Sequence, residues 1–389
     1  MKQILEISGF LALKEIWRNR SRFLLVSMVI ALITLLVLFI AALGEGLGNG
    51  NREYISKLDA QLITYLSKSD YLIAASRLGR DRLASIRRVD GVADAAMLGT
   101  ASATLVLPGE SKPLKIALLG VEPGHTGEPA VVQGQQLSTD LADEVIIDKN
   151  IALRSELKVG DSLTLRTTQG TQDEFYTLRI VGISDGQQYS LQPSIFVPFY
   201  TWDRIRPKSE AEVNSSNPVA NVILVKLTDP TAVDAVSARI SSQVNNVETA
   251  TLKQAILALP GYSAQQSTLN TQGGFTLFIG VLVIGGFFQI QILQKVAQIG
   301  VLKAIGTANP IVALASILQI VVVTMIGVAI GGLLTFLFSL SFPPTVPIVF
   351  NGTTTAIAVI ALLLIGPLSG LVSTRYAVRI EPLKALGLS

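Results

Sequence analysis

Residues 294–306 read Gln-Lys-Val-Ala-Gln-Ile-Gly-Val-Leu-Lys-Ala-Ile-Gly and lie between two apolar runs, each long enough to cross a membrane. A connection this short cannot form a domain of its own. It nevertheless carries large apolar side chains at near-helical spacing, namely Ile299, Val301, Leu302 and Ile305. Such side chains need to be buried, either in the lipid interface or against a partner protein. The segment therefore predicts a short basic helix at a membrane boundary, with these two candidate roles.

The composition is that of a membrane protein with one large aqueous insert. Of the 389 residues, 49% are hydrophobic and only 15% are charged, whereas a soluble protein carries about a quarter charged residues. The net charge of +3 is too small to indicate a nucleic-acid partner. The absence of cysteine excludes disulfides, thiolate catalysis and cysteine metal sites, and the single histidine, His125, cannot form a histidine cluster. A large external domain without disulfides fits a bacterium or an archaeon better than a eukaryotic secreted protein, and a bacterial plasma or inner membrane is the expected location.

Four segments meet the length and hydrophobicity that a transmembrane helix requires. They are Phe23–Leu43, Gly274 to about Leu293, about Ile311 to Leu340, and about Thr355 to Ser373. The sequence therefore predicts four membrane spans, with residues 44–273 as one domain on the outside and residues 274–389 as a second, membrane-embedded domain.

The orientation follows from the lysines and arginines beside the spans. Three groups lie on one side: Lys14, Arg18, Arg20 and Arg22 before the first span, Lys295 and Lys303 between the second and third, and Arg375, Arg379 and Lys384 after the fourth. The loop of residues 341–354 carries no charge. Both termini and the short central loop are therefore predicted to be cytoplasmic, in the plasma or inner membrane.

Residues 1–22 and the first apolar run can be interpreted in two ways. A cleaved signal peptide is one, since small residues follow the apolar run at Ala41 and Ala42. The run is longer than a typical signal-peptide core, however, and about twenty residues precede it. These carry an apolar stripe that ends at Trp17, beside basic residues. Residues 1–22 are therefore predicted to form an interfacial helix on the inner leaflet.

The external insert is predicted to be an α+β domain. A strand–helix–strand order occurs twice, with a long insertion between the two occurrences, which indicates a split β-α-β arrangement. The first unit comprises strand pieces at 62–66 and 71–75, a helix at 81–88 and a strand at 92–98, and the second a strand at 221–227, a helix at 231–243 and a strand at 247–251. The insertion is β-rich, with strands expected at 144–147, 162–166, 177–183 and 194–197. Residues 265–274 are the most linker-like stretch.

No motif for catalysis is present in the sequence. Asp148, Asp161, Asp173 and Glu174 lack paired spacing and are interpreted as solvated surface carboxylates. There is no Gly-x-Ser-x-Gly elbow, no His-Glu-x-x-His motif and no Walker sequence Gly-x-x-x-x-Gly-Lys-(Ser/Thr). The chain is therefore not expected to be an enzyme, to bind a cofactor or metal, or to hydrolyse ATP itself.

Four motifs together resemble the FtsX/MacB type of ABC transporter permease. Residues 297–306 are similar to that family's Arg-Glu-Ile-Gly-x-Leu-(Lys/Arg)-Ala-(Ile/Leu)-Gly, with Ala297-Gln298 in place of Arg-Glu. Residues 12–20 resemble its N-terminal interfacial helix, residues 144–183 its MacB-like extracytoplasmic core, and residues 377–386 its C-terminal ending. The four matches follow the family's order and span most of the chain.

The resemblance implies a function for the opening segment. In such permeases the short helix after the second span couples the membrane helices to a separate cytoplasmic ATPase, which uses ATP. The residues implied at this interface are Gln298, Ile299, Gly300, Leu302, Lys303, Ile305 and Gly306. The alternative is a purely interfacial helix. The family also implies a homodimer of permease chains in contact with membrane lipid, and it leaves room for an extracytoplasmic accessory protein.

The resemblance is compatible with more than one cargo and more than one function. Residues 22–36 with Gly46 and Asn51 are similar to the HrtB/DevC-like branch, which includes heme and glycolipid exporters. Glu45 is the candidate substrate contact at the outer mouth, although a solvated loop carboxylate is the simpler interpretation. The expected function is export of, or mechanical work on, a lipophilic or peptide-like substrate. An FtsX-like signalling protein that regulates cell-wall hydrolases is the alternative.

Two other classes of protein are disfavoured. A secondary transporter is disfavoured because the spans carry no charged residue. A tethered enzyme is disfavoured because four spans exceed what an anchor needs.

Overall fold

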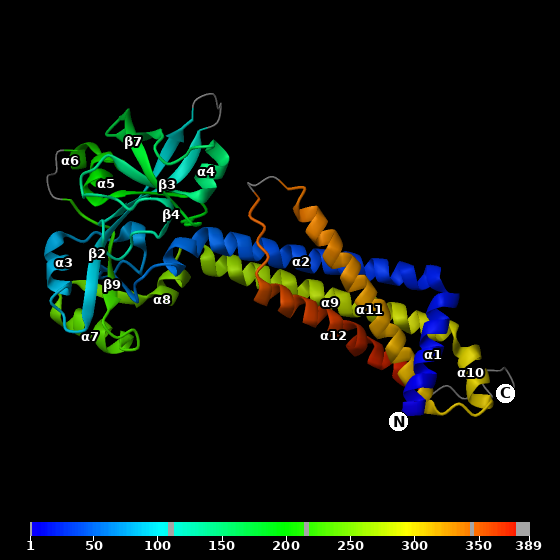
Figure 1. The fold of residues 1–389 in the computed structure, drawn as a ribbon. Coiled ribbons are helices and arrows are strands. Elements are labelled where there is room, and N and C mark those ends of the chain that lie inside the picture. Colours follow the sequence, from blue (N-terminus) through cyan, green and yellow to red (C-terminus); the bar gives the residue numbers. More distant parts are fainter. Residues whose placement is uncertain (1, 108–112, 214–217, 343–345, 379–389) are drawn as a thin grey trace. The chain divides into compact units, whose positions relative to one another are not determined.

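The computed structural model describes residues 2–107, 113–213, 218–342 and 346–378 (Figure 1). The chain divides into two compact units. One combines Met1–Gly46 with Gln266–Ser389 and is called the helical unit here. The other, Leu47–Gln265, is called the sheet unit.

Among the residues that the structure describes, three helices are long and apolar enough to cross a membrane: α2 (Arg20–Ser56), α9 (Tyr262–Gln294) and α11 (Asn309–Ser339). Three of the four predicted spans are thus confirmed as helices of this kind. The fourth falls on α12 (Gly352–Val378), whose apolar stretch with described side chains, Gly352–Leu368, is shorter. The helical unit also contains α1 (Lys2–Arg18) and α10 (Val296–Ala304). Most of the C-terminal motif at 377–386 lies outside the described residues.

The predicted linker at residues 265–274 is wrong. These residues belong to α9, which begins at Tyr262, and α2 likewise continues past the predicted span end at Leu43 to Ser56. The stretch contains Gln, Ser, Thr, Asn and Gly but no Pro. Each of these costs under about 1 kcal/mol in a helix interior, and extending an existing helix needs no new nucleus. Polar composition ends the apolar span but does not end the helix.

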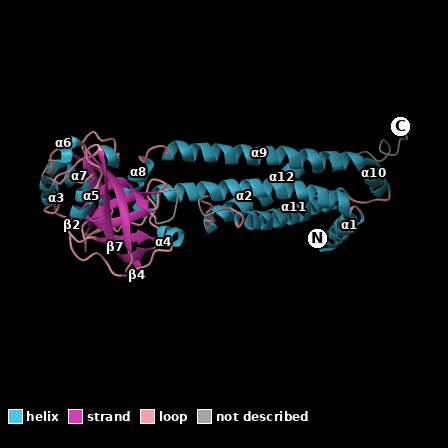
Figure 2. Cartoon of the chain, turned by 90° about the horizontal axis from the view of Figure 1, so that it is seen from above, coloured by secondary structure: helices cyan, strands magenta, loops and turns pink. Residues whose placement is uncertain are grey.

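Close contacts at glycines hold α2 against α11. A Cβ atom at Gly327 would lie 2.6 Å from Ile30, and one at Gly331 would lie 2.5 Å from the carbonyl oxygen of Ala31. Figure 1 shows α2, α9 and α12 running in similar directions, with α11 crossing α2 and α9 at an angle; Figure 2 shows the same helices from above. One apolar cluster draws residues from all four, including Ile30, Ile284, Val323 and Leu362. Small residues permit this close approach of helix backbones in a membrane.

The sheet unit is built on two interleaved β-α-β units, which confirms the split arrangement. The first is β1 (Leu62–Leu66), α3 (Arg80–Ile86) and β2 (Val92–Val106), and the second is β9 (Val222–Leu227), α7 (Val233–Gln243) and β10 (Val247–Thr251). The strand order is β10-β1-β9-β2, with antiparallel neighbours. Each unit therefore places its two strands on either side of a strand from the other unit.

The β-rich insertion closes into a ring of six strands. These are β2, β3 (Leu114–Val121), β8 (Ser194–Pro198), β5 (Glu144–Asp148), β7 (Gln172–Ser184) and β6 (Ser162–Gln169), and β6 pairs back with β2. One buried cluster includes a residue from every strand of the ring: Leu105, Ile116, Ile195, Ile147, Ile180 and Leu165. The remaining elements are β4 (Val131–Gly134) beside β7, the 3-10 turn η1 (Ile73–Ala75), and the helices α4 (Lys149–Ser155), α5 (Phe199–Ile205), α6 (Glu210–Val213) and α8 (Leu252–Leu257).

The strand predicted at 71–75 is wrong. Residues 73–75 form η1, and the chain before it turns at Asp70 and Tyr71, whose φ angles are +54° and +56°. Two successive residues with left-handed backbone cannot continue an extended strand. The apolar run Tyr-Leu-Ile-Ala-Ala gives no indication of this turn. Strand β3 was not predicted.

Trp202 of α5 packs on a pair of glycines in neighbouring strands. Gly99 of β2 and Gly120 of β3 lie opposite each other, and Trp202, which is 2% exposed, covers both. A Cβ atom at Gly99 would lie 2.5 Å from three atoms of the indole ring. Real Cβ contacts are not this short, so the ring would have to move.

Gly99→Ala is therefore expected to destabilise the sheet unit by about 2–3 kcal/mol, the cost of overpacking a well-filled core. The melting temperature of the full chain, followed by tryptophan fluorescence, should fall by roughly 5–10 °C. Gly273→Ala is the control, because a Cβ atom there meets nothing within 4 Å. Equal melting temperatures for the two variants would contradict this account of the Trp202 contact.

Candidate functional site

The predicted coupling segment forms α10 (Val296–Ala304), a short helix between α9 and α11. It ends in a motif with two backbone hydrogen bonds, Thr307 N to Leu302 O at 3.0 Å and Gly306 N to Lys303 O at 3.0 Å. This pattern places the residue after the C-cap in the left-handed region, and Gly306 has φ +97°. Glycine adopts that conformation without strain, so Gly306 ends α10 sharply.

The predicted apolar face of α10 divides into an anchored part and an exposed part. Ile299 is only 7% exposed and packs within the chain against Ile292 of α9 and Val312 of α11. Leu302 is 37% exposed and Ile305 79% exposed. The expectation that all three side chains form one partner-facing surface is therefore corrected: Ile299 holds α10 to its neighbours, and Ile305 faces away from them.

The other predicted residues of this segment have different environments. Gly300 is buried and Gln298 is exposed, while Lys303 is partly buried. Gln298, Ile299 and Leu302 line a cavity of about 340 Å³, called the α10 cavity below. Most of its other lining residues come from α1, α9 and α11, and Asn19, Lys295 and Thr307 lie in the connections between helices.

An ion pair that lines the α10 cavity joins α1 to the junction of α9 and α10. Lys295, at the junction of α9 and α10, lies 2.5 Å from the Glu15 carboxylate of α1, and the two side chains are 12% and 28% exposed. The Gln319 amide of α11 donates to Glu15, while its oxygen lies 3.4 Å from Lys295. The Lys295 ammonium also lies 5.3 Å from the centre of the Phe23 ring. The group thus connects the N-terminal end of α10 to α1, α2 and α11.

Sequence reasoning did not identify this group. Lys295 was used only for orientation, and Glu15 only as part of the N-terminal motif. The sequence does contain one indication, since Gln319 is a polar residue inside the third apolar run. Polar residues inside membrane helices are costly unless they have partners, but the sequence does not indicate that the partner is 304 residues away.

Glu45 is not a solvated loop carboxylate. It lies in α2, and its two oxygens accept hydrogen bonds from Asn351 Nδ2 at 3.2 Å and Thr354 Oγ1 at 3.5 Å. The same chain segment continues against α2, since Val349 N donates to Ala42 O at 3.1 Å. Glu45 therefore holds the first turn of α12 against α2, where a negative charge also favours the helix N-terminus.

The four carboxylates predicted to lie on the surface all have structural partners. Asp161 accepts from Lys158 N at 2.8 Å, and Glu174 accepts from the Tyr176 hydroxyl at 3.0 Å. Asp148 is a correction, because it is fully buried. It caps α4 through Asn150 N at 2.8 Å and also accepts from Gln187 N at 3.1 Å. Burial raises the pKa of the Asp148 carboxyl.

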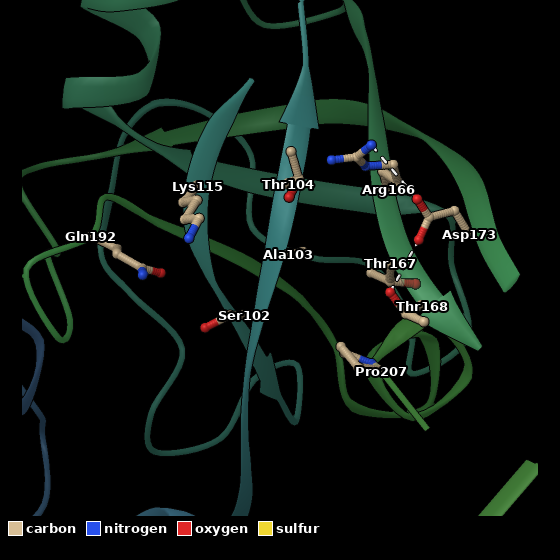
Figure 3. A pocket seen from close by; sticks show the side chains of 10 residues that line it. All are labelled: Ser102, Ala103, Thr104, Lys115, Arg166, Thr167, Thr168, Asp173, Gln192 and Pro207. Carbon is tan, nitrogen blue, oxygen red and sulfur yellow. Dashed lines mark hydrogen bonds and ion pairs between the residues drawn. The ribbon is translucent and has the colours of Figure 1, made fainter. Parts of the chain in front are cut away.

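The sheet unit contains a polar depression of about 250 Å³ where β2 and β6 separate (Figure 3). Figure 3 shows Lys115 and Gln192 on one side of β2, and Arg166 with Asp173 on the other. Arg166 Nη1 lies 3.6 Å from Asp173 Oδ2, and Thr168 Oγ1 donates to Asp173 Oδ1 at 3.1 Å. Asp173 is the one carboxylate among the ten lining residues, so the depression lacks paired carboxylates for acid–base catalysis. Among the described residues, no group of three or more His, Cys, Asp or Glu could hold a metal ion.

Comparison with known proteins covers both units. Residues 23–243 match the family described as MacB-like periplasmic core domain, and residues 271–382 match FtsX-like permease C-terminal. A putative hemin transport system permease protein HrtB of Staphylococcus haemolyticus is 24% identical over 377 residues, which cover 97% of this chain and 99% of that protein. An uncharacterised ABC transporter permease of Mycobacterium bovis is 23% identical over 387 residues, with the same two coverages.

Two solved structures resemble part of the chain at low overall similarity. The periplasmic region of MacB from Actinobacillus actinomycetemcomitans is 13% identical with a TM-score of 0.36, covering 51% of this chain and 92% of that one. The extracellular domain of the transporter YknZ from Gram-positive bacteria is 12% identical with a TM-score of 0.35, covering 49% and 99%. The family matches span more than half of the chain, in the order that the sequence motifs predict. The chain therefore belongs to the FtsX/MacB-type ABC transporter permeases and is a membrane protein with a MacB-like periplasmic domain and an FtsX-like permease domain.

Proposed function

We propose that this chain is the membrane-spanning subunit of an ABC exporter, driven by ATP hydrolysis on a separate cytoplasmic subunit. The family implies such an ATPase partner. The observation that carries the proposal is the environment of α10: Ile299 fixes the helix to α9 and α11, while Ile305 is left exposed at its end. A helix held in this way can transmit a push from a partner to the spans.

The proposed membrane arrangement keeps the four spans and the cytoplasmic termini predicted from the sequence. The sheet unit then lies outside, and α12 provides the fourth span. The proposed domain limits remain 1–22, 23–43, 44–273 and 274–389. The apolar part of α2 ends at residue 43 and that of α9 begins at residue 274, although both helices extend beyond these limits. Several large apolar side chains of α9 are exposed: Phe275, Phe278, Ile279, Leu282 and Ile290. We propose that these side chains contact lipid, or contact a second permease copy in a homodimer.

Heme is the proposed cargo, within the broader class of lipophilic or peptide-like substrates. The support is the name of the Staphylococcus haemolyticus relative, a putative hemin transport permease that matches over nearly its whole length. In this proposal Glu45 acts at the outer end of the substrate path. It positions the loop before α12 against α2, and a substrate contact by its carboxylate stays a prediction.

The test begins with the tagged full-length chain, purified in mild detergent from its native host and analysed by mass spectrometry. We expect a stoichiometric ATPase subunit, and ATP hydrolysis by the reconstituted pair that rises several-fold with hemin. Glu45→Gln keeps the side-chain size and removes the charge, and it should reduce the hemin response while leaving basal hydrolysis unchanged.

Two outcomes would contradict different parts of the proposal. Recovery of the chain without any ATPase, in several detergents, would overturn the exporter assignment. Stimulation by a lipophilic peptide but not by hemin would retain the exporter and overturn the cargo.

A further inference from the structure

The α10 cavity has a charge that the coupling role does not explain. Among its lining side chains, all of them described, Lys14, Arg18 and Lys295 are positive and Glu15 is negative, which gives a net charge of +2. Glu15 is paired with Lys295 at 2.5 Å. The surplus positive charge therefore belongs to Lys14 and Arg18, two residues one helical turn apart on α1. A basic pocket between helices at the end of a membrane bundle suits an anionic headgroup.

A buried amide in the same cavity needs an acceptor. Gln291 of α9 is 4% exposed and lines the cavity, and its Nε2 has no hydrogen-bond partner among the described residues. Leaving such a donor unpaired in a buried place is unfavourable. An oxygen-rich ligand in the cavity would supply the acceptor. This observation does not depend on the charges and points to the same class of ligand.

An exposed apolar surface lies beside the α10 cavity, and Lys14 and Arg18 border both. Phe10, Leu13 and Trp17 of α1 are 63%, 62% and 80% exposed. Together with Lys14 and Arg18 they line a second depression. Lys14 and Arg18 thus lie at the border between a cationic cavity with a mixed polar and apolar lining and an exposed apolar face. A free anion would use only the cavity, whereas an anionic amphiphile would use both sides.

We propose that the α10 cavity binds the headgroup of an anionic phospholipid, with its phosphate between Lys14 and Arg18 and its acyl chains along Phe10, Leu13 and Trp17. The headgroup would accept a hydrogen bond from Gln291 and contact Gln298 and Leu302 of α10. The lipid would thereby connect α1 to the coupling helix. Only the leaflet assignment rests on the proposed orientation, because binding itself does not require an ATPase.

The experiment measures lipid retained by the full-length chain, by native mass spectrometry after delipidation and addition of phosphatidylglycerol or phosphatidylcholine. We expect selective retention of phosphatidylglycerol. Replacing both basic residues, Lys14→Ala with Arg18→Ala, should weaken retention about tenfold or more, since each contributes about 1 kcal/mol near an anionic headgroup. Arg20→Ala with Arg22→Ala is the matched control, because it removes the same charge from residues that do not line the cavity.

Gln291→Leu separates a specific site from general attraction to positive charge. It leaves every charge in place and should still reduce phosphatidylglycerol retention several-fold. It also provides the test if the Lys14 and Arg18 variant does not fold. Inorganic phosphate should not displace the lipid; displacement at millimolar phosphate would identify a free-anion site instead. Equal retention of the two lipids, or equal losses in the control variant, would overturn the proposal.

Discussion

Ile305→Asp is expected to remove the ATPase subunit from the purified complex while the permease chain stays folded. Ile305 is 79% exposed at the end of α10, so a charge there does not disturb the chain's own core. At an interface the same change removes burial worth about 2 kcal/mol and adds the cost of desolvating a carboxylate. Affinity for the ATPase should therefore fall by roughly a hundredfold or more.

The measurement is the ratio of ATPase to permease after affinity purification, followed by titration of the isolated ATPase against the chain in detergent. Leu153→Asp is the matched control. Leu153 lies on α4 of the sheet unit and is 78% exposed, so the chemical change and the exposure are the same. Retention of stoichiometric ATPase by Ile305→Asp, or an equal loss with Leu153→Asp, would show that α10 is not the docking helix.

Ile299→Asp is a poor test of the same interface. The side chain is 7% exposed and packs against Ile292 and Val312. A carboxylate placed there would be buried without a partner, which destabilises the chain itself. Loss of the ATPase in that variant would not distinguish a damaged interface from a detached α10.

The difference between Ile299 and Ile305 shows what could be predicted for α10 from the sequence. The presence of a short helix followed from the spacing of its apolar residues. Helix geometry places Ile305 about 120° around the axis from Ile299, so both cannot lie on a narrow stripe. Ile299 is the buried one because it contacts Ile292 and Val312. The sequence pattern of α10 alone does not predict that tertiary contact.

The sheet unit was predicted best where strands alternate or follow clear turns. Residues 222–227 and 247–251 formed strands as expected, and the turn at Gly170 joins β6 to β7. Strand β3, Leu-Lys-Ile-Ala-Leu-Leu-Gly-Val, was missed, since a nearly continuous apolar run lacks the alternation of a half-buried strand. Closure of the six-stranded ring depends on the pairing of β2 with β6, a contact about 60 residues apart in sequence. Propensity and periodicity describe neighbours along the chain and cannot specify such a pairing.

Lys295→Met is expected to lower the free energy of unfolding more than Glu15→Gln does, because it weakens the attachment of α10 to the membrane helices. Removing Lys295 leaves the Glu15 carboxylate, which is 28% exposed, with a hydrogen bond from the Gln319 amide but no cation beside it. Breaking a buried ion pair costs about 3–5 kcal/mol, and the partial exposure of Glu15 reduces this to about 2–3 kcal/mol. Glu15→Gln leaves Lys295 near the Gln319 oxygen and the Phe23 ring, so its cost should be about 1 kcal/mol.

The double variant distinguishes an ion pair from two independent side chains. Because Glu15→Gln with Lys295→Met leaves no unpaired charge, its destabilisation should fall short of the sum of the single variants by about 1 kcal/mol or more. Free energies of unfolding come from denaturant titration in mixed micelles. Lys226→Met is the control, because Lys226 pairs with Asp59 at the same 2.5 Å but both side chains are exposed, 42% and 71%. Because solvent screens an exposed pair, Lys226→Met should change the free energy of unfolding far less than Lys295→Met does.

The same variants separate docking from transmission. Lys295 does not lie on the exposed end of α10, so Lys295→Met should keep the ATPase bound and its basal hydrolysis intact. The hemin response should fall, because the connection from α10 to α1 and α11 passes through the pair with Glu15 and the amide of Gln319. Strictly additive free energies together with an unchanged hemin response would show that α10 transmits motion only through its apolar anchor at Ile299.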